Sequence, residues 1–366
     1  MSDNYNAPSR EGPISFVNAY DLERAASEVI PHGGLDYIRG GAGDEWTMRQ
    51  NTCAFQHMQI VPRVLSNIEN PNAATSLLGI KIPFPIIMTS CAAHGLAHTT
   101  AEMGTARGVK EAGTIMSVST YANASIEEIA DAGAGGPQFF QLYMSKDKGF
   151  NKAVVKEAER AKAKAVILTV DATVGGNREA DVRNNFTMPL PMATLEKLSQ
   201  GKGLSIHDIF ANALQKISPK SIEEVASYTK LPVIVKGIQS AKDAKAAIDA
   251  GAAAIQVSNH GGRQLDGGPA SFDVLSDIAA AVNKKVPIIF DSGIRRGQHI
   301  FKAIASGANV VAIGRPVLYG LALGGWQGVK EVFDYFHKDL LMVMQLAGTR
   351  TVKDIQKTKL LKNCAF

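Results

Sequence analysis

A parallel (β/α)8 barrel is the fold that the sequence predicts, and the prediction depends on two observations. First, eight short apolar runs follow one another from residue 84 onward, separated by stretches with helical periodicity. Second, four of the predicted helices are followed at once by glycine, which suits a helix end and a short return to the next strand. Repeated alternation of strand and helix is typical of parallel sheets, and eight repeats match the barrel. The apolar runs are residues 85–89, 114–118, 138–142, 165–170, 232–235, 253–257, 287–290 and 309–313. The helical stretches are residues 100–112, 125–132, 150–161, 222–227, 241–250, 272–282 and 297–306.

A doubly wound open sheet is the alternative, because it shows the same alternation of strand and helix. Open sheets that bind dinucleotides usually carry a GxGxxG motif directly after the first strand. No such motif follows the run at residues 85–89. The barrel is therefore the favoured fold.

A single domain is expected over residues 1–366, with two segments that do not follow the barrel repeat. Residues 1–83 form an N-terminal helical segment, with helical spacing at 16–30, 32–38 and 45–55 and no strand pattern. The barrel itself covers residues 84–345, and its final helix, 326–345, has apolar residues at packing positions.

The second segment is an insertion after the fourth strand, at residues 172–218. Asp171 and Pro232 are separated by 60 residues, far more than a loop and one helix require. Within it, residues 188–203 are rich in proline and glycine, and we expect an irregular, mobile lid over the barrel mouth. An excursion over the surface is the alternative.

Composition excludes several classes of protein. The formal net charge of +5 is small for 366 residues and no block of Lys and Arg occurs, so nucleic acid is not an expected partner. No apolar run reaches membrane-spanning length, and residues 1–15 lack the apolar core of a secretory signal. The three cysteines, Cys53, Cys91 and Cys364, are far apart without metal-ligand spacing. This pattern indicates a reducing compartment and no metal site, so we expect a cytoplasmic enzyme.

Polar residues follow several predicted strands at positions i and i+2, which places both side chains on the same side of the strand. The C-terminal ends of barrel strands form the active site of such enzymes, so we expect these pairs to converge there. After the sixth strand, His260 can take up a proton beside the fixed positive charge of Arg263. The fifth strand ends at Lys236 and the seventh at Asp291. The pairs are Ser119/Tyr121, Gln141/Tyr143, Thr169/Asp171 and Ser258/His260.

The ends of the seventh and eighth strands combine glycine with arginine. Gly293 and Arg295 follow the seventh strand, and Gly314 and Arg315 follow the eighth. Glycine lets backbone N–H groups approach a phosphate, and arginine supplies charge and paired donors. Barrel enzymes commonly bind phosphate at this position. A phosphate-bearing cofactor is therefore expected, and exposed arginines beside turn glycines are the alternative.

Residues 258–265, Ser-Asn-His-Gly-Gly-Arg-Gln-Leu, resemble the active-site signature of the FMN-dependent α-hydroxy acid oxidising enzymes. Segments 168–171, 177–181, 235–237 and 291–295 match other motifs of that family in order and spacing, and the resemblance covers about residues 16–345. Segments 31–34, 43–46, 92–98 and 323–328 are similar to one group within it, the bacterial L-lactate oxidases.

The resemblance implies a set of catalytic roles. His260 would be the catalytic base, and Asp171 would orient its imidazole and stabilise the charged form. Three residues would bind the substrate carboxylate and a fourth would bond the substrate hydroxyl: Arg178, Arg263 and Tyr37 for the carboxylate, Tyr143 for the hydroxyl.

The resemblance also implies FMN as the cofactor, and no metal. Lys236 would stabilise negative charge at the N1–C2 carbonyl edge of the ring. The ring would be lined by Ala92, Ser119, Gln141, Thr169 and Ser258, and the rest of the cofactor, with its phosphate, would lie against Asp291, Gly293, Arg295, Gly314 and Arg315.

Two positions depart from the family pattern. Ser90 stands where the family usually has proline, beside the expected ring. The chain ends in Phe366, where a tyrosine is expected in lactate oxidases.

The expected activity is oxidation of L-lactate, or a similar small L-2-hydroxy acid, to the 2-keto acid, with O2 reduced to hydrogen peroxide. Within the family, a 2-hydroxy acid dehydrogenase and a lactate monooxygenase stay open. More remote alternatives are an aldolase that forms a Schiff base on Lys236 and a non-catalytic barrel that binds a phosphate ligand. Family resemblance also implies a homotetramer.

Overall fold

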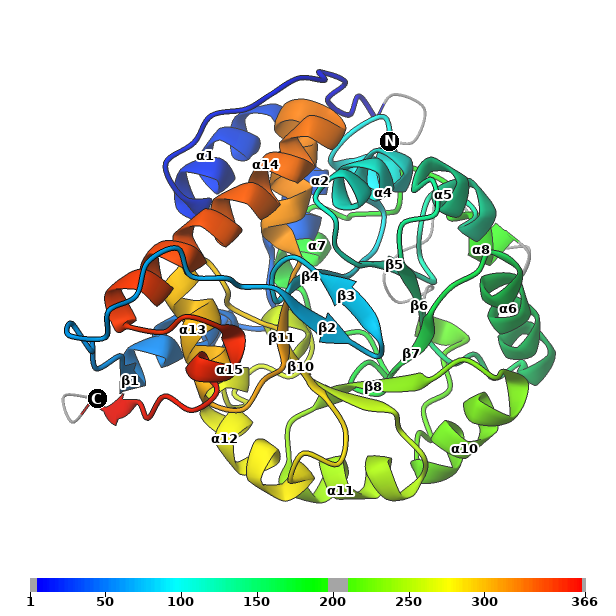
Figure 1. Cartoon of the computed structure of the whole chain (residues 1–366). Helices are drawn as coiled ribbons and strands as arrows, with labels where there is room; N and C mark the ends of the chain where they lie inside the picture. The colour runs from blue at the N-terminus through cyan, green and yellow to red at the C-terminus, as the bar shows by residue number, and fades with distance from the viewer. Residues whose placement is uncertain (1–4, 197–209, 364–366) are drawn as a thin grey trace.

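The computed structural model describes residues 5–196 and 210–363, and its centre is a closed barrel of eight parallel strands (Figure 1). The strands neighbour one another in the order β10-β11-β4-β5-β6-β7-β8-β9, with β9 pairing back to β10. The predicted barrel and all eight of its strands are therefore confirmed, and the open sheet is excluded. The barrel strands are β4 (Ile86–Cys91), β5 (Met116–Ser119), β6 (Gln138–Leu142), β7 (Ala165–Thr169), β8 (Val233–Ile238), β9 (Ala254–Val257), β10 (Ile288–Phe290) and β11 (Val310–Ile313).

The helices surround the barrel as predicted. They are α4 (Ala101–Glu111), α5 (Ile126–Ala132), α6 (Lys148–Arg160), α10 (Pro219–Tyr228), α11 (Ala241–Asp249), α12 (Ser271–Val282), α13 (Gly297–Ala305) and α14 (Arg315–Ala347). The backbone of α14 leaves helical geometry at Gly324 and Gly325. The predicted helix at 326–345 is therefore the second half of α14, and the first half completes the barrel repeat.

The N-terminal segment contains α1 (Ala19–Val29), α2 (His32–Arg39), α3 (Trp46–Cys53) and the 3-10 turn η1 (Ala54–His57). The expectation that it has no strands is wrong. A hairpin of β2 (Thr75–Leu77) and β3 (Ile80–Ile82) follows the helices, and β1 (Met58–Gln59) pairs with β12 (Leu361–Lys362) near the end of the chain. These strands have two or three residues each, too few for a periodic pattern to be recognised.

The hairpin covers one end of the barrel (Figure 1). Its turn residues, Leu78 and Gly79, both have positive φ, which matches the twist of a tight two-residue hairpin. Leu77 and Ile82 are buried in one cluster with the side chains of the barrel interior. The N-terminal end of the barrel is thereby closed.

Helix α3 is joined to the chain where it leaves β9. The side-chain amides of Asn51 and Asn259 donate to each other's carbonyl oxygens, at 2.9 Å and 2.6 Å, in a buried environment. This contact places the N-terminal helices at the C-terminal end of the barrel strands, where the predicted site lies.

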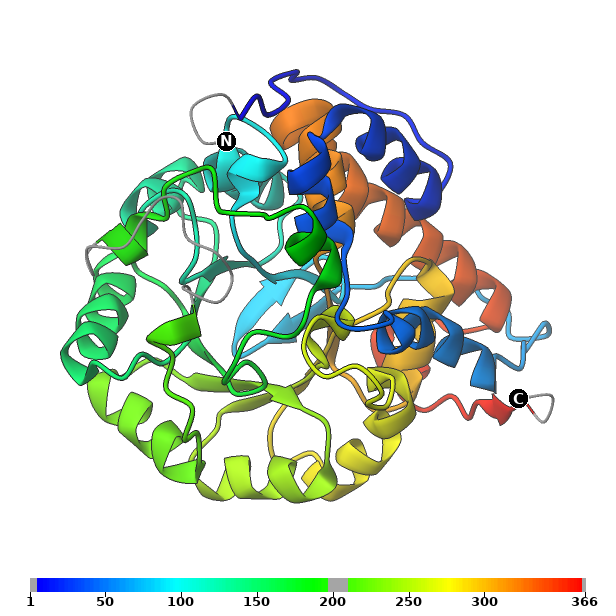
Figure 2. The same cartoon turned by 180° about the vertical axis from the view of Figure 1, so that it is seen from behind.

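The insertion contains α7 (Glu179–Arg183) and α8 (Ala193–Glu196) and runs across the end of the barrel opposite to the hairpin (Figure 2). Residues 188–192 are irregular as predicted, whereas 193–196 form α8, and the whole segment 188–196 is packed rather than loose. Met188, Met192 and Leu195 are buried, and the Asn123 side chain donates to the Pro191 carbonyl at 2.7 Å. The remaining part of the predicted lid, 197–203, lies outside the described residues.

Two other expectations concern the last residue of the chain and membrane-spanning segments. The departure at Phe366 lies outside the described residues. No helix in the described part of the chain has the length and apolar character needed to cross a membrane.

Candidate active site

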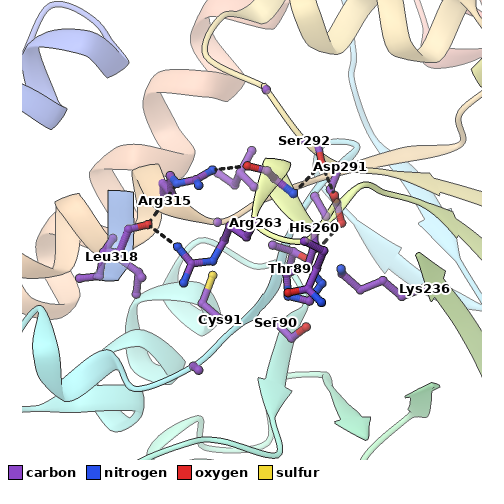
Figure 3. Close-up of a pocket in the computed structure, with 18 of the residues that line it drawn as sticks. Thr89, Ser90, Cys91, Lys236, His260, Arg263, Asp291, Ser292, Arg315 and Leu318 are labelled. Atoms are coloured by element: carbon purple, nitrogen blue, oxygen red, sulfur yellow. Dashed lines mark hydrogen bonds between the residues drawn. The ribbon is translucent and has the colours of Figure 1, made fainter. Parts of the chain in front are cut away.

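A cavity lies at the C-terminal ends of the barrel strands and includes most of the predicted site residues (Figure 3). Together with the open space at its mouth, it comprises about 1070 Å³. Its lining includes the predicted residues Tyr37, Ala92, Tyr143, Arg178, Lys236, His260, Arg263, Asp291, Gly293, Arg295, Gly314 and Arg315. The lining does not include the other five predicted residues, Ser119, Gln141, Thr169, Asp171 and Ser258, although Asp171 and Ser258 are hydrogen-bonded to the lining residues His260 and Lys236.

His260 is held between an acid and a phenol. Its Nδ1 lies 2.9 Å from Oδ1 of Asp171, and its Nε2 lies 3.2 Å from the hydroxyl of Tyr143. The backbone at His260 has φ of 61°, and its N–H donates to Oγ of Ser258 at 3.0 Å. A non-glycine residue in this region of φ is uncommon and is often found at functional sites. The turn therefore directs the imidazole into the cavity, with Nε2 toward the Tyr143 hydroxyl.

Charges around His260 favour its neutral form. Burial is the main cause that lowers the pKa of His260, and the Lys236 ammonium lowers it further, while Asp171 acts in the opposite direction. Burial acts to raise the pKa of Asp171, but Lys236 and His260 outweigh it, so this pKa lies below its usual value. A neutral imidazole beside an ionised carboxylate is ready to accept a proton.

Asp171 packs directly against β8. Gly237 has φ of 105°, and a Cβ added to it would lie 2.6 Å from Cβ of Asp171. Both the conformation and the close approach require glycine at this position. The sequence places Gly237 next to Lys236, so the same strand end supplies a buried cation and the space for Asp171.

Four arginines line the cavity, and three of them, Arg263, Arg315 and Arg178, differ in their hydrogen bonds. Arg263 donates through Nη1 to the carbonyls of Tyr37 and Gly40, at 2.6 Å and 2.9 Å. Arg315 donates to the carbonyls of Ile38, Gly40 and Gly261 at 3.0–3.1 Å. The side chain of Arg178 makes no hydrogen bond to another residue in the described ranges, and its Nε is buried without a partner, although the residue is only 7% exposed. Its donors are therefore available to an anionic ligand.

The guanidinium groups of Arg178 and Arg263 both approach the ring of Tyr37, at 5.4 Å and 5.1 Å from its centre. Burial, and after it the charge of Arg178, lower the pKa of Arg263 to about 10. Two guanidinium groups close to one ring create a locally positive site that suits a carboxylate.

The predicted ring-binding residues form two buried hydrogen-bonded groups. Ser119 donates to Gln141 at 3.1 Å, and the Gln141 amide donates to Thr169 at 3.0 Å. Lys236 donates to Ser258 at 3.0 Å. Figure 3 shows Lys236 on one side of His260, and Arg263 and Arg315 on the other.

The predicted phosphate-binding residues lie at one end of the cavity. Gly293 has φ of 85°, and an added Cβ would lie 2.2 Å from the Asn51 carbonyl oxygen, so only glycine fits there. Arg295 donates from Nη1 to the carbonyl of Ile294 at 2.9 Å. Asp291 accepts from Ser292 at 2.8 Å and from Gln256 at 2.6 Å.

Sequence reasoning missed several residues that line the cavity. Cys91 faces Arg263 and Arg315 (Figure 3), and burial raises the pKa of its thiol to about 11. The pairing of β4 with β5 shifts register between Met88 and Cys91, around the departure at Ser90. Phe210 also contributes, with its ring 6.1 Å from that of Tyr143. No metal-binding group of three His, Cys, Asp or Glu side chains occurs among the described residues.

The fold and the cavity define a barrel enzyme in which a His–Asp pair, a buried lysine and several arginines meet at one site. The chain belongs to the FMN-dependent dehydrogenase family, which it matches over residues 26–362. The L-lactate oxidase of Lentilactobacillus hilgardii is 56% identical over 359 residues, which are 98% of this chain and 97% of that protein. The L-lactate oxidase of Streptococcus iniae is 48% identical over 360 residues, 98% and 89% of the two chains. A crystal structure of a protein from Pediococcus acidilactici described as a lactate oxidase has a TM-score of 0.95 and 56% identity, covering 99% of each chain.

The cofactor of this family fits the residues present. Lys236 is 3% exposed and donates to Ser258, and an ammonium has three donors, so capacity remains for an anionic ring edge. At the ends of β10 and β11 the backbone passes close to other residues, Gly293 to Asn51 and Gly314 to Cys91, and neither glycine leaves room for a larger side chain without a shift. The cations Arg295 and Arg315 line the same cavity. FMN is therefore the cofactor of this chain, and the aldolase and the simple binding barrel are not supported.

Proposed function

We propose that this protein oxidises L-lactate to pyruvate on bound FMN and passes the electrons to O2, which gives hydrogen peroxide. The observation that carries the proposal is the position of His260, whose Nε2 faces a cavity that Arg178 and Arg263 also line. The relatives described as L-lactate oxidases, at 48% and 56% identity, support the choice of substrate and of O2.

The cavity residues divide the work on the substrate. Arg178 binds the carboxylate with its available donors, and Arg263, which also lies near the Tyr37 ring, adds positive charge. The carboxylate then fixes the α-carbon relative to the ring-binding residues. Such positioning accounts for a large part of the rate in reactions of bound partners.

His260 removes the proton of the substrate hydroxyl at Nε2, and the Tyr143 hydroxyl lies beside it at 3.2 Å. Burial raises the pKa of Tyr143 well above its usual value, so this phenol stays protonated and can donate to the substrate oxygen. Asp171 stabilises the imidazolium through Nδ1. FMN, when bound, would accept the hydrogen of the α-carbon together with the two electrons of the C–H bond that breaks.

A peroxide assay with purified, FMN-loaded protein tests the proposal. A panel of L-lactate, D-lactate, glycolate and L-mandelate should give the highest kcat/KM with L-lactate and one hydrogen peroxide per pyruvate. Acetate in place of pyruvate would indicate a monooxygenase, and flavin reduction without peroxide would indicate a dehydrogenase.

Three finer proposals accompany this function. We infer a homotetramer and a cytoplasmic location, which light scattering and cell fractionation test directly. We also infer that the 172–218 insertion covers the bound substrate, since Arg178 and Phe210 belong to it and line the cavity.

A further inference from the structure

Asp181 is a buried carboxylate that the reaction described above does not use. It lies on α7, three residues after Arg178, and is 5% exposed. Neither of its carboxylate oxygens has a hydrogen-bond partner among the described residues. An ionised group in this situation is costly unless an opposite charge compensates it.

The compensating charges are the two arginines of the substrate site. Oδ2 of Asp181 lies 3.7 Å from Nε of Arg178, which is close enough for a strong charge interaction but too far for a hydrogen bond. Burial raises the pKa of Asp181 above its usual value; Arg178 and then Arg263 act to lower it, and Asp36 adds to the rise. Both guanidinium groups are therefore near enough to interact with this carboxylate.

The position of Asp181 relative to the cavity is also informative. Arg178 lines the active-site cavity and a neighbouring pocket, whereas Asp181 lines only the neighbouring pocket. Asp181 thus lies behind Arg178, on the side away from the substrate, as Asp171 lies behind His260. Because it accepts no hydrogen bond from Arg178, it leaves the arginine's donors available.

We propose that Asp181 is a positioning residue that holds Arg178 in the cavity by charge alone and offsets the repulsion between Arg178 and Arg263. The inference rests on the proposed function and assigns a role to a residue outside the cavity lining. With Asp181 ionised, the group of Arg178, Arg263 and Asp181 carries two positive charges and one negative charge, and a substrate monocarboxylate makes this group neutral. Removal of the Asp181 charge leaves two positive charges to bind the anion as tightly or more tightly, but Arg178, repelled by Arg263, no longer aligns the bound carboxylate for reaction.

The experiment measures binding and chemistry separately in the FMN-loaded enzyme. Pyruvate is titrated anaerobically and followed by the flavin spectrum, and flavin reduction by L-lactate is followed by stopped flow. Asp181→Asn should bind pyruvate as tightly as the parent or up to about tenfold tighter, and should reduce its flavin more than threefold more slowly. Weaker pyruvate binding, or a reduction rate within threefold of the parent, would overturn the proposal.

Asp36→Asn is the matched control, since Asp36 is also a buried carboxylate (7% exposed) but is bonded to Arg39 and Asn184. It should leave the pyruvate Kd within twofold of the parent. A change there as large as in Asp181→Asn would mean that any buried acid in this region has the effect, and would refute the specific role of Asp181.

A double variant covers the case in which Asp181→Asn fails to fold. Arg178→Met with Asp181→Asn removes both charges, so no unpaired buried ion remains. If Asp181 acts through Arg178, the double variant should reduce its flavin within threefold of Arg178→Met alone. A further loss beyond threefold contradicts the proposal. If the parent itself is not reduced by L-lactate, the proposed function fails, while the pyruvate titrations still test Asp181.

Discussion

Replacement of Asp171 by asparagine is the sharpest test of the proposed base. The variant keeps the shape of the side chain, so the close contact with Gly237 is retained and only the charge is lost. At 2.9 Å from Nδ1 of His260, the carboxylate and an imidazolium interact by about 6 kcal/mol with an effective dielectric constant of about 20. This upper limit corresponds to about 10⁴-fold in rate. Since the amide can still bond to the ring, we expect a loss of about 10²–10⁴-fold in flavin reduction.

The assay is anaerobic stopped-flow reduction by saturating L-lactate over a range of pH. Activity requires neutral His260, so the rate falls as pH drops through the pKa of this group. Asp171 acts to raise that pKa, so its removal should move the acidic limb of the profile to lower pH. Reduction within fivefold of the parent, or an acidic limb that moves to higher pH, would refute the assignment of Asp171 and His260 as an interacting pair.

Three further outcomes follow from the same geometry. His260→Gln should retain FMN, but its rate of flavin reduction should fall by several orders of magnitude, since a base contributes about 10²–10⁴-fold and the orientation of the substrate is also lost. A near-normal rate of reduction would remove His260 from the mechanism. Arg263→Lys should lower the reduction rate on the order of 100-fold through misplacement, and Arg263→Met should be worse, with the loss of a buried charge; a normal dependence on lactate in the Met variant would contradict this role. Gly237→Ala should lower both Tm and activity, because its Cβ would lie 2.6 Å from that of Asp171, and an unchanged melting curve would show that the two strand ends can separate freely.

The barrel and the contact between His260 and Asp171 could be predicted because their signals are local. Each barrel strand is a short apolar run, and the side chains that follow it by one to three residues lie at a common end. For this reason we expected His260, Asp171 and Tyr143 together, although they follow three different strands. Asp171 and Tyr143 do lie within hydrogen-bond distance of His260.

The remaining features depend on contacts between distant parts of the chain. Arg315 was expected to face a phosphate. Each of its three side-chain nitrogens also donates to a backbone carbonyl, of Ile38, Gly40 or Gly261, and no local sequence pattern predicts these contacts. The hairpin at residues 75–82 was missed because its strands are too short to show periodicity. The packing of residues 188–196 was missed because proline-rich segments predict irregular backbone but not what the backbone contacts.

The pairing of the two ends of the chain has a consequence for how the protein is made. β1 pairs with β12, Asn72 bridges to Thr351, and α1 packs on α14, with Tyr319 bonded to Glu23 at 3.2 Å. The first helix emerges from the ribosome about three hundred residues before its partner, and contacts of such long sequence separation slow folding. The apolar face of the N-terminal segment therefore stays uncovered until translation of the chain is almost complete. During that interval the nascent chain is most exposed to aggregation and to proteases.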